Sequence, residues 1–97
     1  MIHVTGQLIC ATPEDAALVA ALLPSHIRLS RAEAGCLTFN VTRSADPLIW
    51  HLDETFTDRA AFKAHQARTR TSAWFAATAH IARDFQLFDS GPGQDAE

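Results

Sequence analysis

The amino-acid sequence predicts an α+β fold: a four-stranded antiparallel sheet with helices packed on one of its faces. Two segments, 36–42 and 48–56, alternate apolar and polar residues, which is typical of strands with one buried face. Two others, 13–33 and 59–81, repeat apolar residues at helical spacing and begin after helix-capping residues. At 97 residues the chain is expected to form a single domain over residues 1–89, with a short tail after it.

The first strand is expected over residues 2–10, and a helix follows it. Thr12 supplies a capping hydroxyl, and Pro13 takes the first helical position ahead of two acidic residues that favour a helix N-terminus. Pro24 interrupts the apolar repeat, so the segment forms either one kinked helix or two helices. Gly35 is well placed to end it. The stripe expected on one side of the helix consists of Leu18, Leu22, His26, Leu29 and Glu33.

Two strands joined by a turn come next. From Cys36 the period changes to two, so alternate side chains point to opposite faces of the sheet. The residues expected to share the apolar face are Leu37, Phe39 and Val41. A turn over residues 44–47, with the sequence Ser-Ala-Asp-Pro, leads back into a strand over 48–56. One face of that strand is expected to carry Trp50, Leu52, Glu54 and Phe56.

A second helical region and a last strand complete the expected fold. Asp58 begins a helix over residues 59–67, and after a break a further helix is expected over 72–81. The inward stripe of the first piece consists of Ala61, Phe62 and His65. A strand over 82–88 follows. Residues 90–97 are small, polar and rich in Gly and Pro, so a disordered C-terminal tail is predicted there.

The expected order is therefore strand, helix, strand, strand, helix in two pieces, strand, which is the ferredoxin-like split βαβ arrangement. In this arrangement the helices cover one face of the sheet and leave the other uncovered. A small chain must solvate such a face or cover it with another molecule, and two copies paired face to face make a closed, symmetric dimer. We expect a homodimer through the open sheet face, which would form a dimeric α/β barrel.

Composition and motifs exclude several classes of function. The net charge is −3, with eight basic residues scattered among eleven acidic ones, so no nucleic-acid partner is expected. No apolar run approaches the roughly 20 residues that span a bilayer, and the first residues do not resemble a signal peptide, so we expect a cytoplasmic protein with no membrane contact. The two cysteines and five histidines lack the spacing of metal sites, and no Gly-rich phosphate loop is present. Neither a metal nor another cofactor is predicted.

Two stretches within residues 31–65 carry a resemblance. They read E-A-G-C-L-T-F-N-V and D-P-L-I-W-H-L-D-E-T-F-T-D-R-A-A-F-K-A-H, and they resemble the antibiotic biosynthesis monooxygenase family of small dimeric α+β barrel proteins. The similarity extends over about residues 2–88. It implies a cofactor-independent oxidation, by O2, of a quinol, an anthrone or a similar aromatic phenol.

Such a reaction needs an apolar slot for a flat ring, a proton acceptor, and polar groups that hold an oxyanion. His65 lies on an inward helical stripe and has an ordinary pKa near 6.5, which suits a base at neutral pH. Glu54 is the second candidate, because burial among apolar side chains raises the pKa of a carboxyl group, and the two residues could pair. The residues expected to contact substrate are Trp50, Phe39, Phe62, Trp74 and Phe75 as ring walls, with His26 and Asn40 as hydrogen-bonding groups.

Each of these residues also has a purely structural alternative. His65 and Glu54 could bond only to each other, to backbone or to a second subunit, and the tryptophans could belong to the core. Haem degradation, which some relatives carry out, is not expected, because the Asn, Trp and His that those relatives share is absent as a set. A non-catalytic dimeric binding or stress-associated domain, holding a small apolar ligand in the same cavity, is the alternative function.

Overall fold

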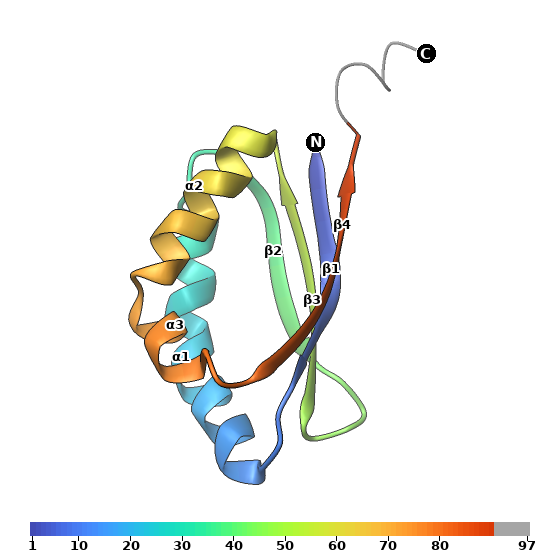
Figure 1. Ribbon diagram of the computed structural model, residues 1–97, viewed down its shortest axis with the longest axis vertical. Helices are drawn as coiled ribbons and strands as arrows, with labels where there is room; N and C mark the ends of the chain where they lie inside the picture. Colours follow the sequence, from blue (N-terminus) through green and yellow to red (C-terminus); the bar gives the residue numbers. More distant parts are fainter. Residues whose placement is uncertain (91–97) are drawn as a thin grey trace.

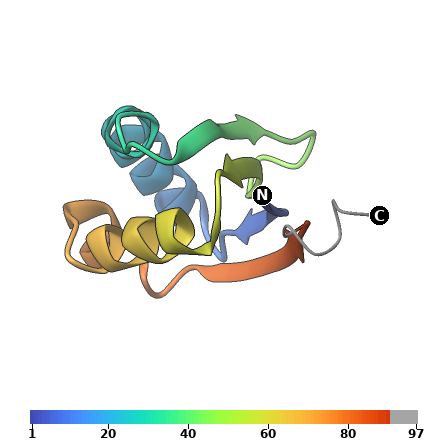
Figure 2. The same ribbon diagram turned by 90° about the horizontal axis from the view of Figure 1, so that it is seen from above.

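Residues 1–90 are described by a computed structural model of the protein. The strands form one antiparallel sheet in the order β2-β3-β1-β4, and the helices lie on one face of it (Figure 1 and Figure 2). This arrangement confirms the predicted ferredoxin-like fold, and the sheet of a single chain is open. The elements are β1 (Ile2–Ile9), α1 (Pro13–Arg31), β2 (Cys36–Arg43), β3 (Ile49–Phe56), α2 (Arg59–Arg70), α3 (Ala73–Thr78) and β4 (Ala82–Asp89).

The first strand, β1, lies inside the sheet, paired with β3 on one side and β4 on the other. The pairing with β4 extends one residue beyond Asp89, because the main-chain N–H of Ser90 donates to the carbonyl of Met1 at 3.0 Å. Ser90, predicted as the first residue of the tail, is therefore attached to the sheet. The rest of the predicted tail lies outside the described residues.

The first helix, α1, is one helix that runs through Pro24. Thr12 begins it as predicted, with its Oγ1 accepting a hydrogen bond from the main-chain N–H of Asp15 at 3.1 Å. Pro24 lies on the exposed side, so its ring does not contact the sheet. Between residues 1 and 90 no helix is both long enough and apolar enough to cross a membrane.

The buried stripe of α1 differs from the predicted one. Leu29 is 47% exposed, and Leu18 and Leu22 are only half-buried, so the predicted orientation of Leu29 is wrong. Two neighbouring apolar lines run along this helix, and spacing alone does not tell which one faces the sheet. The residues that α1 buries are Val19, Leu23, His26 and Ser30.

Gly35 has a different role from the predicted one. The helix ends at Arg31 with Ala32 in the right-handed conformation, and no glycine of residues 1–90 has a positive φ. A Cβ atom on Gly35 would lie only 2.1 Å from the Cβ of Ala61. The glycine therefore allows α2 to pack closely against the loop between α1 and β2.

Strand β2 departs from strict alternation at its start, where the pairing with β3 shifts between Cys36 and Thr38. Such a bulge changes the face to which a side chain points. Leu37 is consequently 55% exposed, whereas Phe39 is buried, so the prediction that they share a face is wrong. On β3 the predicted apolar face is confirmed by the buried side chains of Trp50, Leu52, Glu54 and Phe56.

The second helical region breaks near the predicted position, but its pieces have different lengths. The first piece, α2, continues to Arg70, and the second, α3, ends at Thr78. Asp58 and Ser72 cap the two helices by accepting hydrogen bonds from main-chain N–H groups of their first turns. Two clusters of buried apolar side chains fill the space between helices and sheet, one around Phe56 and the other around Trp50.

Candidate functional site

A cavity of about 220 Å³ lies between the sheet and the helices α2 and α3, with walls from every strand and every helix. Its lining is mostly apolar and aromatic, as is usual for small-molecule sites. Seven of the nine residues predicted to form a site line this cavity, and they are His26, Phe39, Glu54, Phe62, His65, Trp74 and Phe75.

Trp50 and Asn40 are not among the lining residues. Trp50 is buried in one of the apolar clusters, and the guanidinium of Arg43 lies 4.4 Å from the centre of its ring. Asn40 is exposed on β2, where its side-chain oxygen accepts a hydrogen bond from Arg31 at 3.0 Å. The alternation of β2 turns Asn40 away from the side of Phe39, so we leave both residues out of the candidate site.

The mouth of the cavity lies beside the edge strand β4. Arg70 on α2 and Phe85 on β4 are the exposed lining residues. Phe85 pairs with Gly6 on β1, and a Cβ atom on Gly6 would lie 2.7 Å from the Phe85 ring. Gly6 therefore makes room for the aromatic side chain at the entrance. No motif or spacing in the sequence singles out Gly6, Arg70 or Phe85.

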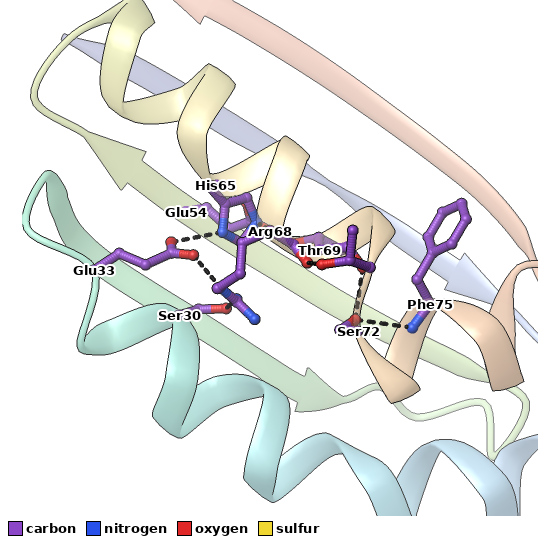
Figure 3. Close-up of polar contacts among 9 residues, drawn as sticks. Ser30, Glu33, Glu54, His65, Arg68, Thr69, Ser72 and Phe75 are labelled. Atoms are coloured by element: carbon purple, nitrogen blue, oxygen red, sulfur yellow. Dashed lines mark hydrogen bonds and ion pairs between the residues drawn. The ribbon is translucent and has the colours of Figure 1, made fainter.

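A hydrogen-bonded network holds His65 in place from one side (Figure 3). The Nδ1 atom of His65 lies 2.8 Å from Oε1 of Glu33, in the loop that follows α1. The other Glu33 oxygen accepts a hydrogen bond from Arg68, which also donates to Ser30 Oγ at 2.9 Å. The carboxylate of Glu33 is thus fixed by a cation on one oxygen and by the imidazole on the other. The partner of His65 predicted from the sequence is Glu54, whereas the structure pairs it with Glu33.

The hydrogen bond to Glu33 determines the tautomer of His65. Because a carboxylate accepts, Nδ1 carries the proton, and Nε2 of the neutral ring keeps its lone pair. The Nε2 atom lies 3.5 Å from Thr69 Oγ1 and 3.9 Å from Glu54 Oε1, so its contact with Glu54 exceeds hydrogen-bond length. Burial lowers the pKa of His65, outweighing the hydrogen bond to Glu33, which acts to raise it. At neutral pH the ring is therefore uncharged.

Glu54, unlike an ordinary surface carboxylate, keeps its proton at neutral pH. Its side chain is buried, and burial raises its pKa to about 8, with smaller contributions from the charges of Glu33 and Asp53. At pH 7 the carboxyl group is mostly protonated. A neutral acid and a neutral base consequently stand side by side in the cavity, as acid–base catalysis requires.

His26 forms part of the aromatic wall. Its ring stacks on Trp74, with 4.8 Å between ring centres and 7° between planes, and it meets the edge of Phe39. Burial, aided by the charges of His65, Arg68 and Arg83, lowers the pKa of His26 to about 3. Its Nδ1 atom is buried and has no hydrogen-bond partner in the described part of the chain.

The fold and this cavity define a ferredoxin-like protein that encloses an aromatic-lined site with a carboxylate-oriented histidine. The sequence profile of the family described as antibiotic biosynthesis monooxygenase matches residues 1–77. The chain belongs to this family, which confirms the resemblance found in residues 31–65. Family membership supports a monooxygenase-type role.

Solved structures with the same fold include an antibiotic biosynthesis monooxygenase that is 25% identical, with a TM-score of 0.74 and coverage of 95% of this chain and 100% of the other. A protein from Deinococcus radiodurans is 23% identical, with a TM-score of 0.79 and coverage of 94% and 93%. Rv0793 from Mycobacterium tuberculosis is 23% identical, with a TM-score of 0.72 and coverage of 91% and 92%. No protein with curated functional information matches the sequence.

Proposed function

We propose that this protein is a cofactor-independent monooxygenase that oxidises an electron-rich phenol or quinol with O2, and that His65 is its general base. The observation that carries the proposal is the Glu33–His65 pair beside an aromatic-lined cavity. A carboxylate that fixes one ring nitrogen leaves the other as a directed proton acceptor, as in catalytic triads. The family supports the monooxygenase-type role.

The proposed reaction begins when Nε2 of His65 takes the phenolic proton. The ring anion passes one electron to O2, and the resulting radical and superoxide combine through a new C–O bond. Glu54 protonates the ring-bound peroxide. Loss of the ring C–H proton to the Glu54 carboxylate and cleavage of the O–O bond then leave a ring carbonyl, and the departing hydroxide takes the proton held by His65. A hydroquinone and O2 thus give a hydroxyquinone and water, and both residues return to their starting states.

The size of the cavity favours a single aromatic ring. An engineered cavity of about 150 Å³ in another protein is large enough for benzene. At about 220 Å³, this cavity holds one substituted ring but little more. A quinol therefore fits the site better than a three-ring anthrone.

The test is oxygen uptake with a panel of substituted hydroquinones. His65→Gln should lower kcat by about 10²- to 10⁴-fold, the usual contribution of a general base. Glu33→Gln should give a smaller loss, because Nε2 remains but its orientation and basicity are weakened. His80→Gln is the matched control, since His80 is exposed and pairs with Asp15 away from the cavity.

The pH dependence provides a second readout. Activity should fall at alkaline pH as Glu54 loses its proton near pH 8, and at acid pH, below neutrality, as His65 gains one. Oxygen uptake by the wild type that does not exceed the uncatalysed rate would contradict an oxidising role. Tight binding of the same rings without turnover would instead favour the non-catalytic binding domain.

The proposed active unit is a homodimer formed through the uncovered face of the sheet. This face carries Phe88, which is 54% exposed and contacts the ring of His3, with Asp53 beside them. Two copies paired through this face would bury it and form the expected α/β barrel. The cavity of each chain lies on the opposite, helix-covered side.

A further inference from the structure

Arg83, at the start of β4, lines the cavity and is held rigidly by the end of α3. Its Nη1 donates to the carbonyl oxygens of Thr78 and Ile81, at 2.8 and 2.9 Å. Its Nη2 donates to Thr78 Oγ1 at 2.9 Å. These bonds fix the plane of the guanidinium group and satisfy carbonyls at the helix C-terminus.

The three bonds leave part of the guanidinium without a partner. A guanidinium carries five N–H donors, and the bonds of Arg83 use only its two terminal nitrogens. In the described part of the chain, Nε donates to no group and no carboxylate lies within ion-pair distance of Arg83. A half-buried arginine without an anionic partner is unusual, because burying a charge is costly unless it is paired.

The rest of the lining does not neutralise this charge. The only carboxyl group that lines the described cavity belongs to Glu54, which is mostly protonated at pH 7. His26 and His65 are uncharged, and Arg70 at the mouth adds a second cation. Glu33 is already engaged by Arg68. The cavity therefore carries net positive charge at neutral pH.

We propose that Arg83 binds a carboxylate on the substrate ring, so that the substrate is a hydroxylated aromatic acid. Planar guanidinium donors match the two oxygens of a carboxylate, and such charge-assisted pairs are the strongest hydrogen bonds of a site. The hydroxyl group of this substrate rests on the proposed function, because His65 is proposed to take the proton of that hydroxyl. The carboxylate end rests only on Arg83 and the charge of the cavity.

The experiment compares two rings that differ only at the charged group. Binding of 4-hydroxybenzoate and 4-hydroxybenzamide to the wild type is measured by calorimetry under argon, so that no turnover is needed. The carboxylate should bind roughly ten- to a hundredfold more tightly than the amide. Arg83→Gln should abolish this preference, and Arg83→Lys should retain part of it. Arg28→Gln, which removes an exposed cation on α1, should leave the preference unchanged.

Equal affinities of the two rings for the wild type would overturn the proposal without any variant. Retention of the preference in a folded Arg83→Gln protein would overturn it as well. The two proposals can fail separately. Carboxylate-selective binding without oxygen uptake on any hydroxylated acid would contradict the proposed oxidation but not the Arg83 site. Oxygen uptake on uncharged hydroquinones, without any preference for the carboxylate in binding, would contradict only the proposal that Arg83 binds a substrate carboxylate.

Discussion

Replacing Glu54 by Gln should make the folded protein progressively more stable, relative to the wild type, as the pH rises from 5 to 8. Among residues 1–90 no hydrogen bond reaches the Glu54 carboxyl group, and the side chain is 7% exposed. Its pKa in the folded protein is about 8, against an ordinary value of 4.5. The folded protein therefore holds a proton that the unfolded chain has released between these two values, and its free energy of unfolding falls as pH rises through that range.

The magnitude follows from the width of that range. Each pH unit between the two pKa values costs about 1.4 kcal/mol of stability. From pH 5 to pH 7 the cost in the wild type grows by about 3 kcal/mol, and it levels off above about pH 8. Glu54→Gln removes this dependence. Burial of an amide without partners has its own cost of about 1–3 kcal/mol, but that cost does not change with pH.

Urea denaturation at pH 5, 7 and 8 measures the effect directly. The stability of the variant relative to the wild type should rise by about 3 kcal/mol between pH 5 and pH 7. Asp84→Asn, which removes an exposed carboxylate from β4, should show no such trend. A constant difference between Glu54→Gln and wild type across this range would refute the assignment of a protonated Glu54. The same variant should lose oxidising activity, since an amide cannot supply the peroxide proton.

The two remaining predictions concern packing and assembly. Gly35→Ala should destabilise the protein by about 1–3 kcal/mol, because the new methyl group would lie 2.1 Å from the Cβ of Ala61. Thermal unfolding measures this loss, and an unchanged Tm would contradict the close approach of Gly35 to Ala61. Phe88→Asp should shift the proposed dimer towards monomer in sedimentation at micromolar concentration, with Leu29→Asp on the opposite side of the molecule as the control.

The sequence predicted the strands well because their patterns are local. Four alternate side chains on β3 face inwards as expected, and the capping residues Thr12 and Asp58 begin their helices at the expected positions. Errors arose where the pattern was ambiguous or interrupted. Two apolar lines compete on α1, which misplaced Leu29, and a bulge at the start of β2 turned Leu37 to solvent.

The candidate site was predictable only in part, for a related reason. His65 and Glu54 followed from periodicity, since each lies on the inward side of its own element. The hydrogen bond between His65 and Glu33 joins residues 32 positions apart, and no local spacing specifies such a contact. Arg83 was not predicted as a site residue. The observation that singles it out is the lack of a carboxylate partner, and this is visible only when all of its neighbours are placed in three dimensions.

Because Glu33 orients His65, the two halves of the cavity should differ in how well they tolerate substitutions. Glu33 lies two residues before Gly35, and Gly35 contacts Ala61, one helical turn before His65. A substitution that moves this loop would also move the carboxylate that orients the imidazole. The half of the cavity that contains His65 should therefore tolerate few substitutions. Among the described residues no hydrogen bond joins His65 to α3 or β4, so side chains of that half that line the cavity are less tightly linked to the imidazole. New substrates could therefore be accommodated there by mutation or by design while the chemistry stays the same.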